Sequence, residues 1–517
     1  MPLKCLLIAG LLLLPACAAF AAGAVQDVRA YGAKGDGTTK DTAAVQAALD
    51  AAARQGGGDI VFPPGRYLCG TLHLKSHLTL RLLSGATLAS SPDPADFDPY
   101  EKLPYETHSD RETSDFHLAL LAGQNIEDVA IVGQGTIDGN RTRRGNRSDQ
   151  GGPKPIALKN CQRITLRDIT VRNAPNYAIS FLGCDYVNVD GVSIRNGYAD
   201  GIDPDCCRHV RIANCFVDSY DDAICLKASL ALGVRRSTEH VTITNCVLTT
   251  SSNFFKMGTE SSGDFKNIAV SNCVMFRRTH ARDSAGLAIE TVDGANIEGL
   301  TIANISMQDV FCPLFLRLGN RGRGLNPPTP GTLRDVSITH IVATGATMTC
   351  SLTGLPGHPV ERVSVENMQV TMQGGATAAS GLDVPELAEK YPESNMFGTL
   401  PAYDIYCRHV DGLTLRNLRL RTAQPDARPA LICDDARDLE LNGLQIETLA
   451  SGQPAIWLHQ SLGALVQGCR LGFPTAHFAR VTGSATRDVR FLGNDLPHVA
   501  KPLEIGPEVS KSAITQR

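Results

Sequence analysis

The chain has 517 residues, 48 of them glycine, and its formal net charge is −4 at pH 7. This length exceeds that of a typical compact domain, but one elongated solenoid can contain it. Nucleic-acid binding is disfavoured, because it needs a concentrated basic surface and the sequence has no basic block. Aromatic residues make up only 5% of the chain, which together with the abundant glycine favours a turn-rich β protein.

Residues 1–22 are predicted to be a signal peptide. Lys4 supplies a positive start, Leu6 to Leu14 an apolar stretch, and Ala19-Phe20-Ala21 a small-x-small cleavage site. A lipoprotein leader ending at Cys17 is an alternative. No later run reaches the roughly 18–20 apolar residues needed to span a bilayer. We therefore expect an exported protein, periplasmic or secreted, that has no membrane contact after cleavage.

The next segment, 23–75, is expected to cap the solenoid. It contains the one convincing amphipathic helix, which Asp41 can cap and which stops at Gly56-Gly57-Gly58. Apolar residues recur within it at helical spacing, at Ala44, Val45, Ala48, Leu49 and Ala52. Such a helix would cover the open hydrophobic end of a solenoid.

A pair of alternating aliphatic residues then recurs along the chain, as in Ile164-x-Leu166 and, 23 residues later, Val187-x-Val189. Alternation with period two indicates a strand, and a recurrence of this length indicates a solenoid. We therefore predict an all-β parallel β-helix over 76–505. The last residues, 506–517, are expected to form a tail, with fraying after about Pro502.

Asparagine and cysteine occupy equivalent positions of several repeats. The asparagines that follow the aliphatic pairs predict a side-chain ladder at a turn: Asn214, Asn245, Asn272, Asn304, Asn367 and Asn417. Cys215, Cys246 and Cys273 each follow such an asparagine, which favours stacked free thiols over disulfides although export permits both. A disulfide involving Cys206 or Cys207 is left open. The chain has no Cys-x-x-Cys pair to suggest a structural zinc site, and no metal is expected.

A second strand per repeat runs from Ile156-Ala157-Leu158-Lys159 to Leu314-Phe315-Leu316-Arg317. It places five charged residues along one stacked sheet: Asp203, Lys227, Lys256, Glu290 and Arg317. The longest segment without the repeat pattern, 374–400, is predicted to be a surface loop. Whether this loop lies over the groove is left open.

Three aspartates beside this sheet are the best candidates for catalysis. Asp200 lies in Tyr-Ala-Asp-Gly-Ile-Asp, and Asp221 and Asp222 lie in Ser-Tyr-Asp-Asp-Ala-Ile, 21 and 22 residues later. Residues one coil apart stack at about 5 Å, so the three carboxylates should form one patch. Crowded carboxylates cannot all ionise easily, and one tends to keep a proton as a general acid for glycosidic hydrolysis.

These motifs resemble glycoside hydrolase family 28, the polygalacturonase and rhamnogalacturonan hydrolase family of right-handed parallel β-helices. The opening, from Val28 to Gln46, resembles the cap of many pectin-active β-helices. The resemblance implies that Asp222 protonates the leaving oxygen, that Asp200 and Asp221 activate water, and that the anomeric carbon is inverted. It also implies a pectic polysaccharide substrate, matches Lys227 to a family lysine, and is compatible with a monomer that uses no cofactor.

Two family motifs differ here. The family's Gly-His-Gly motif falls near Ser252-Asn253-Phe254, where this chain has no histidine. The family's Arg-Ile-Lys motif, whose cations bind a uronate carboxylate, corresponds here to Ala288-Ile289-Glu290. Losing two cations should abolish that uronate subsite, so a rhamnogalacturonan or another branched pectic region becomes plausible. Arginine suits carboxylate recognition, and Arg317, Arg321 and Arg323 form a cluster. The candidate substrate ligands are Lys227, Asp203, Asn253, Lys256, Glu290, Arg317 and Arg321.

Other interpretations stay open at this point. Lys256 and Glu290 can equally well pair with each other. Lyase or epimerase chemistry needs a basic residue and often Ca²⁺, a set that Asp203, Asp205, Asp221 and Lys227 would supply. A non-catalytic glycan-binding solenoid is the third possibility. The sequence does not distinguish exo from endo action.

Overall fold

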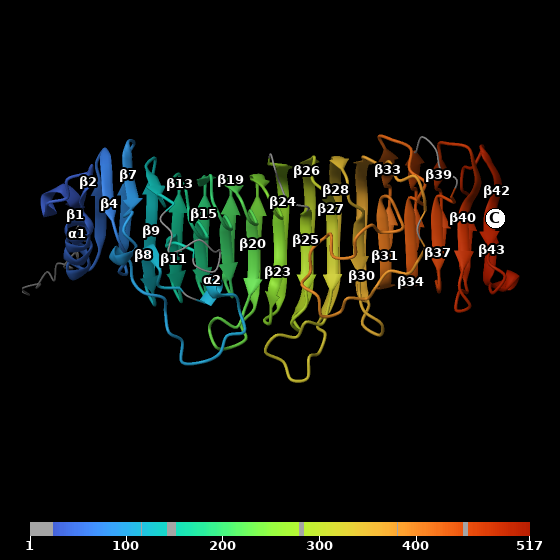
Figure 1. Cartoon of the computed structure of the whole chain (residues 1–517), viewed down its shortest axis with the longest axis horizontal. Helices are drawn as coiled ribbons and strands as arrows, with labels where there is room; N and C mark the ends of the chain where they lie inside the picture. Colours follow the sequence, from blue (N-terminus) through green and yellow to red (C-terminus); the bar gives the residue numbers. More distant parts are fainter. Residues whose placement is uncertain (1–23, 115, 142–150, 279–283, 380, 448–452) are drawn as a thin grey trace, which may run out of the picture.

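The computed structural model describes residues 24–114, 116–141, 151–278, 284–379, 381–447 and 453–517. The coils stack along one long axis, with helix α1 at one end and the C-terminus at the other (Figure 1). The chain is a parallel β-helix, as the repeats predicted. The predicted signal peptide lies outside the described residues. No helix in the described part is long and apolar enough to cross a membrane.

The strands form three parallel series, and each coil contributes one strand to each. The series that carries the site comprises β5 (Leu72–His73), β8 (Ala119–Gln124), β11 (Lys154–Lys159), β14 (Ile179–Leu182), β17 (Ile202–Asp205), β20 (Ile224–Ala228), β23 (Phe255–Ser261), β25 (Ala285–Thr291), β27 (Cys312–Leu318), β29 (Cys350–Thr353), β31 (Ile405–Asp411), β34 (Leu431–Arg437), β37 (Ile456–His459), β40 (Thr475–Thr482) and β42 (Val499–Ile505).

The second series comprises β1 (Ala24–Asp27), β3 (Gly58–Phe62), β6 (Leu78–Leu82), β9 (Glu127–Gly133), β12 (Gln162–Arg167), β15 (Asp185–Asp190), β18 (Arg208–Ala213), β21 (Thr238–Thr244), β24 (Phe265–Phe276), β26 (Asn296–Gln308), β28 (Thr332–Ala346), β30 (Val360–Met372), β32 (Thr414–Arg416), β35 (Glu440–Asn442), β38 (Leu465–Gln467), β41 (Val489–Leu492) and β43 (Ile514–Gln516). The third comprises β2 (Asp36–Lys40), β4 (Gly65–Cys69), β7 (Ala86–Ser90), β10 (Thr136–Asp138), β13 (Thr170–Arg172), β16 (Ser193–Arg195), β19 (Phe216–Ser219), β22 (Val247–Thr250), β33 (Arg419–Thr422), β36 (Gln445–Glu447) and β39 (Arg470–Leu471). The long strands β24, β26, β28 and β30 serve both series.

The core is a column of stacked apolar side chains. In the series that carries the site, equivalent inward positions pair from coil to coil at Ile156, Ile179, Ile202, Ile224, Phe255, Leu287 and Leu314. Each is at most 3% exposed. Because one inward residue fixes the phase of its strand, this stack also fixes which side chains face outward toward the groove.

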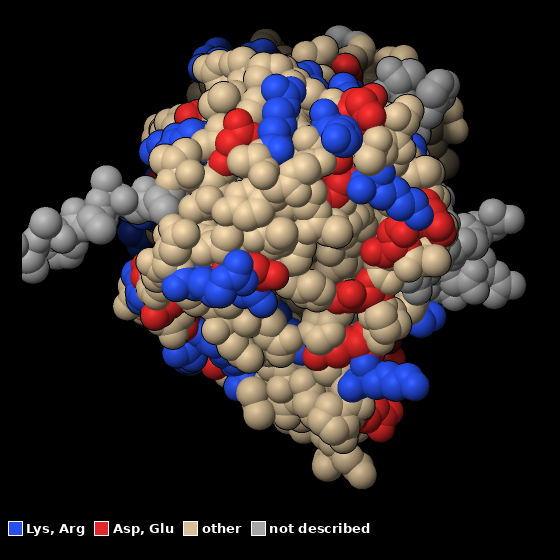
Figure 2. All heavy atoms as spheres, turned by 90° about the vertical axis from the view of Figure 1, so that its left-hand side faces the viewer, with Lys and Arg blue, Asp and Glu red and all other residues tan. Residues whose placement is uncertain are grey.

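Helix α1 (Thr42–Arg54) packs its buried face, which includes Val45 and Leu49, against the first strands. The predicted capping helix is confirmed, but the predicted role of the Asp41 side chain is wrong. Its carboxylate accepts hydrogen bonds from the backbone N–H groups of Lys34 (2.7 Å) and Gly35 (3.0 Å) and does not cap α1. The other helices are α2 (Arg111–Ser114) and 3-10 turns at Val28–Tyr31, Pro94–Asp96 and Lys511–Ala513. At the α1 end, Lys and Arg alternate with Asp and Glu, and no basic patch dominates this face (Figure 2).

The asparagine ladder is present in part: Asn245 donates to Asn214 (3.3 Å), Asn304 to Asn272 (3.0 Å) and Asn417 to Asn367 (2.7 Å). The 14 described cysteines are all free and buried, including Cys206 and Cys207. Stacked thiols are therefore confirmed.

The predicted frayed tail is wrong. Strand β42 pairs with β40, and β43 pairs with β41, so the last coil continues almost to the end of the chain. The backbone groups of this segment are paired within the ladder, as they are elsewhere in the solenoid.

Candidate active site

The three predicted catalytic aspartates lie in the turns before β17 and β20. The backbone of Gly201 donates to the carbonyl of Asp222 (2.9 Å), which sets the two turns in register. One carboxylate oxygen from each of Asp200, Asp221 and Asp222 lies within 4.8 Å of the others. The predicted carboxylate cluster is confirmed.

The cluster opens into a cavity of about 300 Å³. Its lining is Asp110, Glu112, Pro175, Asn176, Tyr177, Tyr198, Ala199, Asp200, Tyr220, Asp221, Asp222, Cys225, Lys227, Lys256, Gly258, Thr259, Glu260 and Tyr391. The cavity therefore draws on four consecutive coils and on two segments outside the sheets.

Asp222 is held in its ionised form. Its Oδ1 accepts from the Ser252 hydroxyl (2.9 Å) and from both the backbone N–H (3.0 Å) and the side-chain amide (2.9 Å) of Asn253. Its Oδ2 lies 3.2 Å from Lys256 Nζ. Burial disfavours the charge, but Lys256 and these donors outweigh it and hold the pKa of Asp222 below its usual value.

Asp200 has the opposite balance. Lys227 Nζ lies 2.9 Å from Asp200 Oδ2 and 3.1 Å from Asp203 Oδ2. Burial and the neighbouring Asp203 charge nevertheless raise the pKa of Asp200 well above its usual value. Burial also raises the pKa of Asp203, against the attraction of Lys227. The proton that a crowded site must retain therefore sits on the Asp200 side of the cluster.

Four predicted substrate ligands lie outside the cavity lining among the described residues. Asp203 forms an ion pair with Lys227, and Asn253 donates a hydrogen bond to Asp222, but neither Asp203 nor Asn253 lines the cavity. Glu290 is fully buried, and neither of its carboxyl oxygens has a hydrogen-bond partner in the described chain. Burial raises the pKa of Glu290 well above its usual value, so its environment favours the protonated form. Arg317 is committed to backbone carbonyls, at 2.7 Å from Glu386 O and 3.2 Å from Gly354 O. None of these four groups lines the described cavity, and their contact with substrate stays a prediction.

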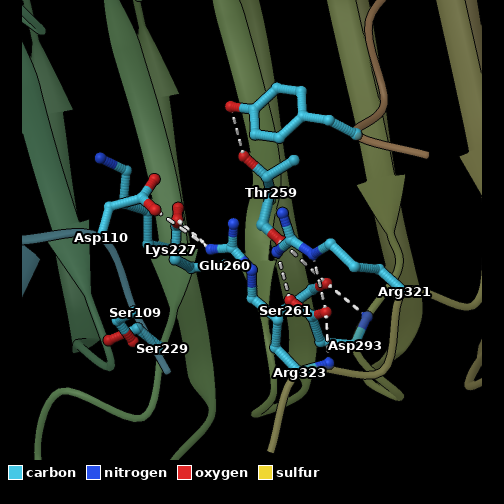
Figure 3. A network of polar contacts seen from close by, with 12 residues as sticks. Ser109, Asp110, Lys227, Ser229, Thr259, Glu260, Ser261, Asp293, Arg321 and Arg323 are labelled. Atoms are coloured by element: carbon cyan, nitrogen blue, oxygen red, sulfur yellow. Dashed lines mark hydrogen bonds and ion pairs between the residues drawn. The ribbon is translucent and has the colours of Figure 1, made fainter. Parts of the chain in front are cut away.

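The remaining predicted ligands divide. Lys227 and Lys256 line the cavity. Lys256 pairs with Asp222, so the alternative pairing of Lys256 with Glu290 is not what the structure shows. Arg321 binds Asp293 through two nitrogens and the Thr259 carbonyl at 2.9 Å, beside the cavity (Figure 3).

Several residues that line the cavity were missed, because they come from loops with no repeat pattern. Asp110 and Glu112 lie between β7 and β8, and Tyr391 lies in the predicted surface loop 374–400. Thr259 donates its hydroxyl to the Tyr391 hydroxyl (2.9 Å), so this loop reaches the groove. Tyr198 and Tyr220 lie next to the catalytic aspartates in the two motifs. This position in the sequence could have identified them as cavity residues.

Three clusters of histidine, cysteine, aspartate or glutamate in the described chain have the spacing of a cation site. Two of them belong to this cavity: Asp200 with Asp221 and Asp222, and Asp200 with Asp203 and Cys225. Lys227 and Lys256 already place ammonium groups on these carboxylates. The positive charge that the cluster needs is thus supplied by the chain itself.

Residues 69–388 match the family model described as "Glycosyl hydrolases family 28". The chain belongs to this family. A second model, for rhamnogalacturonase A/epimerase and pectate lyase-like proteins, matches residues 25–91, which overlap the predicted cap at 23–75.

Similar proteins agree with this assignment. A probable polygalacturonase from Vitis vinifera is 24% identical over 67% of this chain and 74% of its own length. An exo-poly-alpha-D-galacturonosidase from Dickeya chrysanthemi is 29% identical over 40% of this chain and 42% of its own. The solved exopolygalacturonase of Thermotoga maritima superimposes with a TM-score of 0.58 at 20% identity, over 68% of this chain and 87% of that one, and shows the shared fold. The protein is thus a family 28 glycoside hydrolase, and neither a lyase, an epimerase nor a non-catalytic solenoid is favoured.

Proposed function

We propose that this protein is an exported hydrolase that removes residues from the ends of pectic polysaccharide chains. The observation that carries the hydrolysis is the cluster of Asp200, Asp221 and Asp222 in one cavity, with a retained proton and an ionised carboxylate side by side. Relatives named polygalacturonase support the pectic substrate.

Electrostatics favour a division of roles that differs from the one implied by the family resemblance. Asp222 has a lowered pKa, which suits a base that accepts a proton from water and not an acid that donates one. The donated proton then comes from Asp200, whose pKa is raised by burial and by the neighbouring Asp203. Asp200 lines the cavity, from which the leaving oxygen would approach it.

Water, and not a carboxylate, is the proposed nucleophile. The oxygens of the three aspartates lie within 4.8 Å of one another, closer than the roughly 6.5–9.5 Å common in inverting glycosidases. Spacing alone would fit a retaining enzyme. Asp222, however, accepts three hydrogen bonds at Oδ1 and pairs with Lys256 at Oδ2, which leaves it a poor nucleophile. We therefore expect inversion, and ¹H NMR of the first anomer released tests it.

Exo action is proposed because loops cover the groove on both sides of the cavity. On the N-terminal side, Phe116 packs on Ala157 of β11 and Leu182 of β14, and Glu101 pairs with Lys159 at 2.7 Å.

On the C-terminal side, Met396 packs on Ala288 of β25 and Phe315 of β27. Arg317 holds this loop through the carbonyls of Glu386 and Leu387. A cavity closed in this way accommodates a chain end and not a continuous chain.

Product profiles over time test the mode of action. An exo enzyme releases a monosaccharide or a single short product from the first turnovers, whereas a ladder of oligosaccharides would refute exo action. Asp222→Asn and Asp200→Asn serve as paired variants on a substrate with a nitrophenyl leaving group. This leaving group needs little protonation, so loss of the acid is tolerated and loss of the base is not. Equal losses in both variants would contradict the division of roles.

Export through residues 1–22 and a monomeric state are also part of this proposal. Mass spectrometry of the mature N-terminus after expression in a bacterial host tests cleavage near Ala21. Light scattering on the purified protein tests the monomer.

A further inference from the structure

We infer that the residue bound at the bottom of this cavity carries no ionised carboxylate. It is either a neutral sugar or a methyl-esterified uronate, and both present an uncharged group. The inference rests on the proposed hydrolysis of chain ends and specifies which ends are accepted.

The cavity lining is strongly acidic. Its carboxylates are Asp110, Glu112, Asp200, Asp221, Asp222 and Glu260. The lining itself contributes two ammonium groups, those of Lys227 and Lys256, and Arg323 reaches Asp110 and Glu260 from outside it. These three cations face six carboxylates, so the lining has no excess of positive charge for a uronate. A bound uronate would add another negative charge to this lining.

Both lysines of the lining are already engaged. Lys227 contacts Asp200 and Asp203 and lies 4.0 Å from the centre of the Tyr177 ring. Lys256 contacts Asp222 and lies 5.6 Å from the centre of the Tyr391 ring. A uronate that took over either lysine would release a buried aspartate from its cation, and a buried charge without its partner is costly.

The nearby arginines are also paired with carboxylates of the chain. Arg321 binds Asp293, and Arg323 Nη1 lies 3.1 Å from Asp110 Oδ1. The close-up shows both guanidinium groups within this network (Figure 3). Neither arginine belongs to the cavity lining.

The positions where the family resemblance places uronate-gripping cations are closed. Ala288 and Glu290 are each 0% exposed. Met396 packs over Ala288, and burial favours a protonated Glu290. The positions of the family's two cations therefore lie outside the lining of the described cavity.

Uncharged recognition has its own surface here. Tyr198 and Tyr220 stack with ring centres 5.8 Å apart and planes 6° from parallel, and both line the cavity. Aromatic faces contact the C–H faces of a sugar ring without requiring a charge on the sugar.

Calorimetry on the wild-type protein tests the inference directly, because monosaccharides are products and are not turned over. Galactose and galacturonate differ only at C6 and form a matched pair, with rhamnose and the methyl ester of galacturonate as further ligands. Free galacturonate should bind roughly 10-fold or more weakly than galactose, because like charges brought together oppose binding. Equal or tighter binding of galacturonate would overturn the inference. Tighter binding of the ester than of galactose and rhamnose identifies the esterified uronate as the occupant, and the reverse order identifies a neutral sugar.

Turnover is measured separately on oligosaccharides that end in galacturonate, its methyl ester or a neutral sugar. Release from uncharged ends with roughly 100-fold lower kcat/KM for galacturonate ends supports the inference. No release from any of them would sink the proposed function, while the calorimetry still decides the charge preference.

A charge-removing variant provides the internal control. Asp110→Asn removes a lining carboxylate that pairs with Arg323, and should narrow the difference between galactose and galacturonate binding several-fold. Asp335→Asn makes the same change at an exposed pair with Arg362, on a distant coil, and should leave the ratio unchanged. If both variants change the ratio equally, the lining charge does not set the preference.

Discussion

Replacing Lys256 with methionine tests the assignment of Asp222 as the base. Lys256 Nζ lies 3.2 Å from Asp222 Oδ2, and the two side chains are 3% and 6% exposed. At an effective dielectric constant of about 20, this contact corresponds to about 5 kcal/mol of attraction. Removing this cation therefore raises the pKa of Asp222. The donors from Ser252 and Asn253 remain and oppose part of this rise.

The assay is kcat/KM for sugar release across pH. A base must be ionised, so the acidic limb of the profile should move to higher pH. Activity on the acidic limb then falls roughly 10-fold for each unit, and recovers at higher pH. Lys266→Met removes an exposed lysine that pairs with Asp264 and is the matched control. A folded Lys256→Met protein whose acidic limb has not moved would refute the assignment.

Stability provides a second readout with a defined sign. In the wild type, the pKa of Asp222 lies below its unfolded value. Asp222 therefore contributes stability above the unfolded pKa, and this is lost as pH falls through the folded pKa. In Lys256→Met the shift reverses, and the ionised carboxylate destabilises the fold at neutral pH. The difference in Tm between the two proteins should therefore shrink as pH is lowered, and a constant difference would contradict this reasoning.

Three further outcomes are expected. Asn253→Ala removes one of the donors to Asp222 Oδ1, and a lost buried hydrogen bond of roughly 1–3 kcal/mol should lower kcat roughly 10- to 100-fold with little change in KM; steady-state kinetics would reveal a pure KM effect instead. Arg317→Ala frees the loop at Glu386, which should lower Tm and add longer oligosaccharides to the products, and an unchanged product profile would contradict the role of this loop. Because all described cysteines are free, a thiol reductant should leave Tm unchanged, and a reductant-dependent fall in Tm would reveal a disulfide.

The repeat pattern predicted the solenoid because each coil repeats the same physical requirement. One inward aliphatic residue per strand is enough to set the register, and Ile202 stacks on Ile224 as the spacing predicts. The same spacing brought Asp200 to Asp222. Local sequence sufficed wherever neighbours in space are one repeat apart in the chain.

Interactions that bypass the repeat could not be predicted in this way. Arg323 pairs with Asp110 from 213 positions away, and Thr259 bonds Tyr391 from 132. Asp41 illustrates the same limit on a smaller scale, because its carboxylate serves the amides of a preceding turn and not the helix that follows it.

The sequence by itself determined the coil stack and the meeting of three aspartates, since both follow from periodicity. Only the tertiary structure decided their charges. Whether a carboxylate keeps its proton depends on burial and on the cation beside it, and those neighbours, such as Lys256 at Asp222, come from the next coil. The tertiary structure also shows that Ala288 and Glu290 are fully buried and that Met396 packs with Ala288. The sequence alone indicated an altered uronate subsite at these positions.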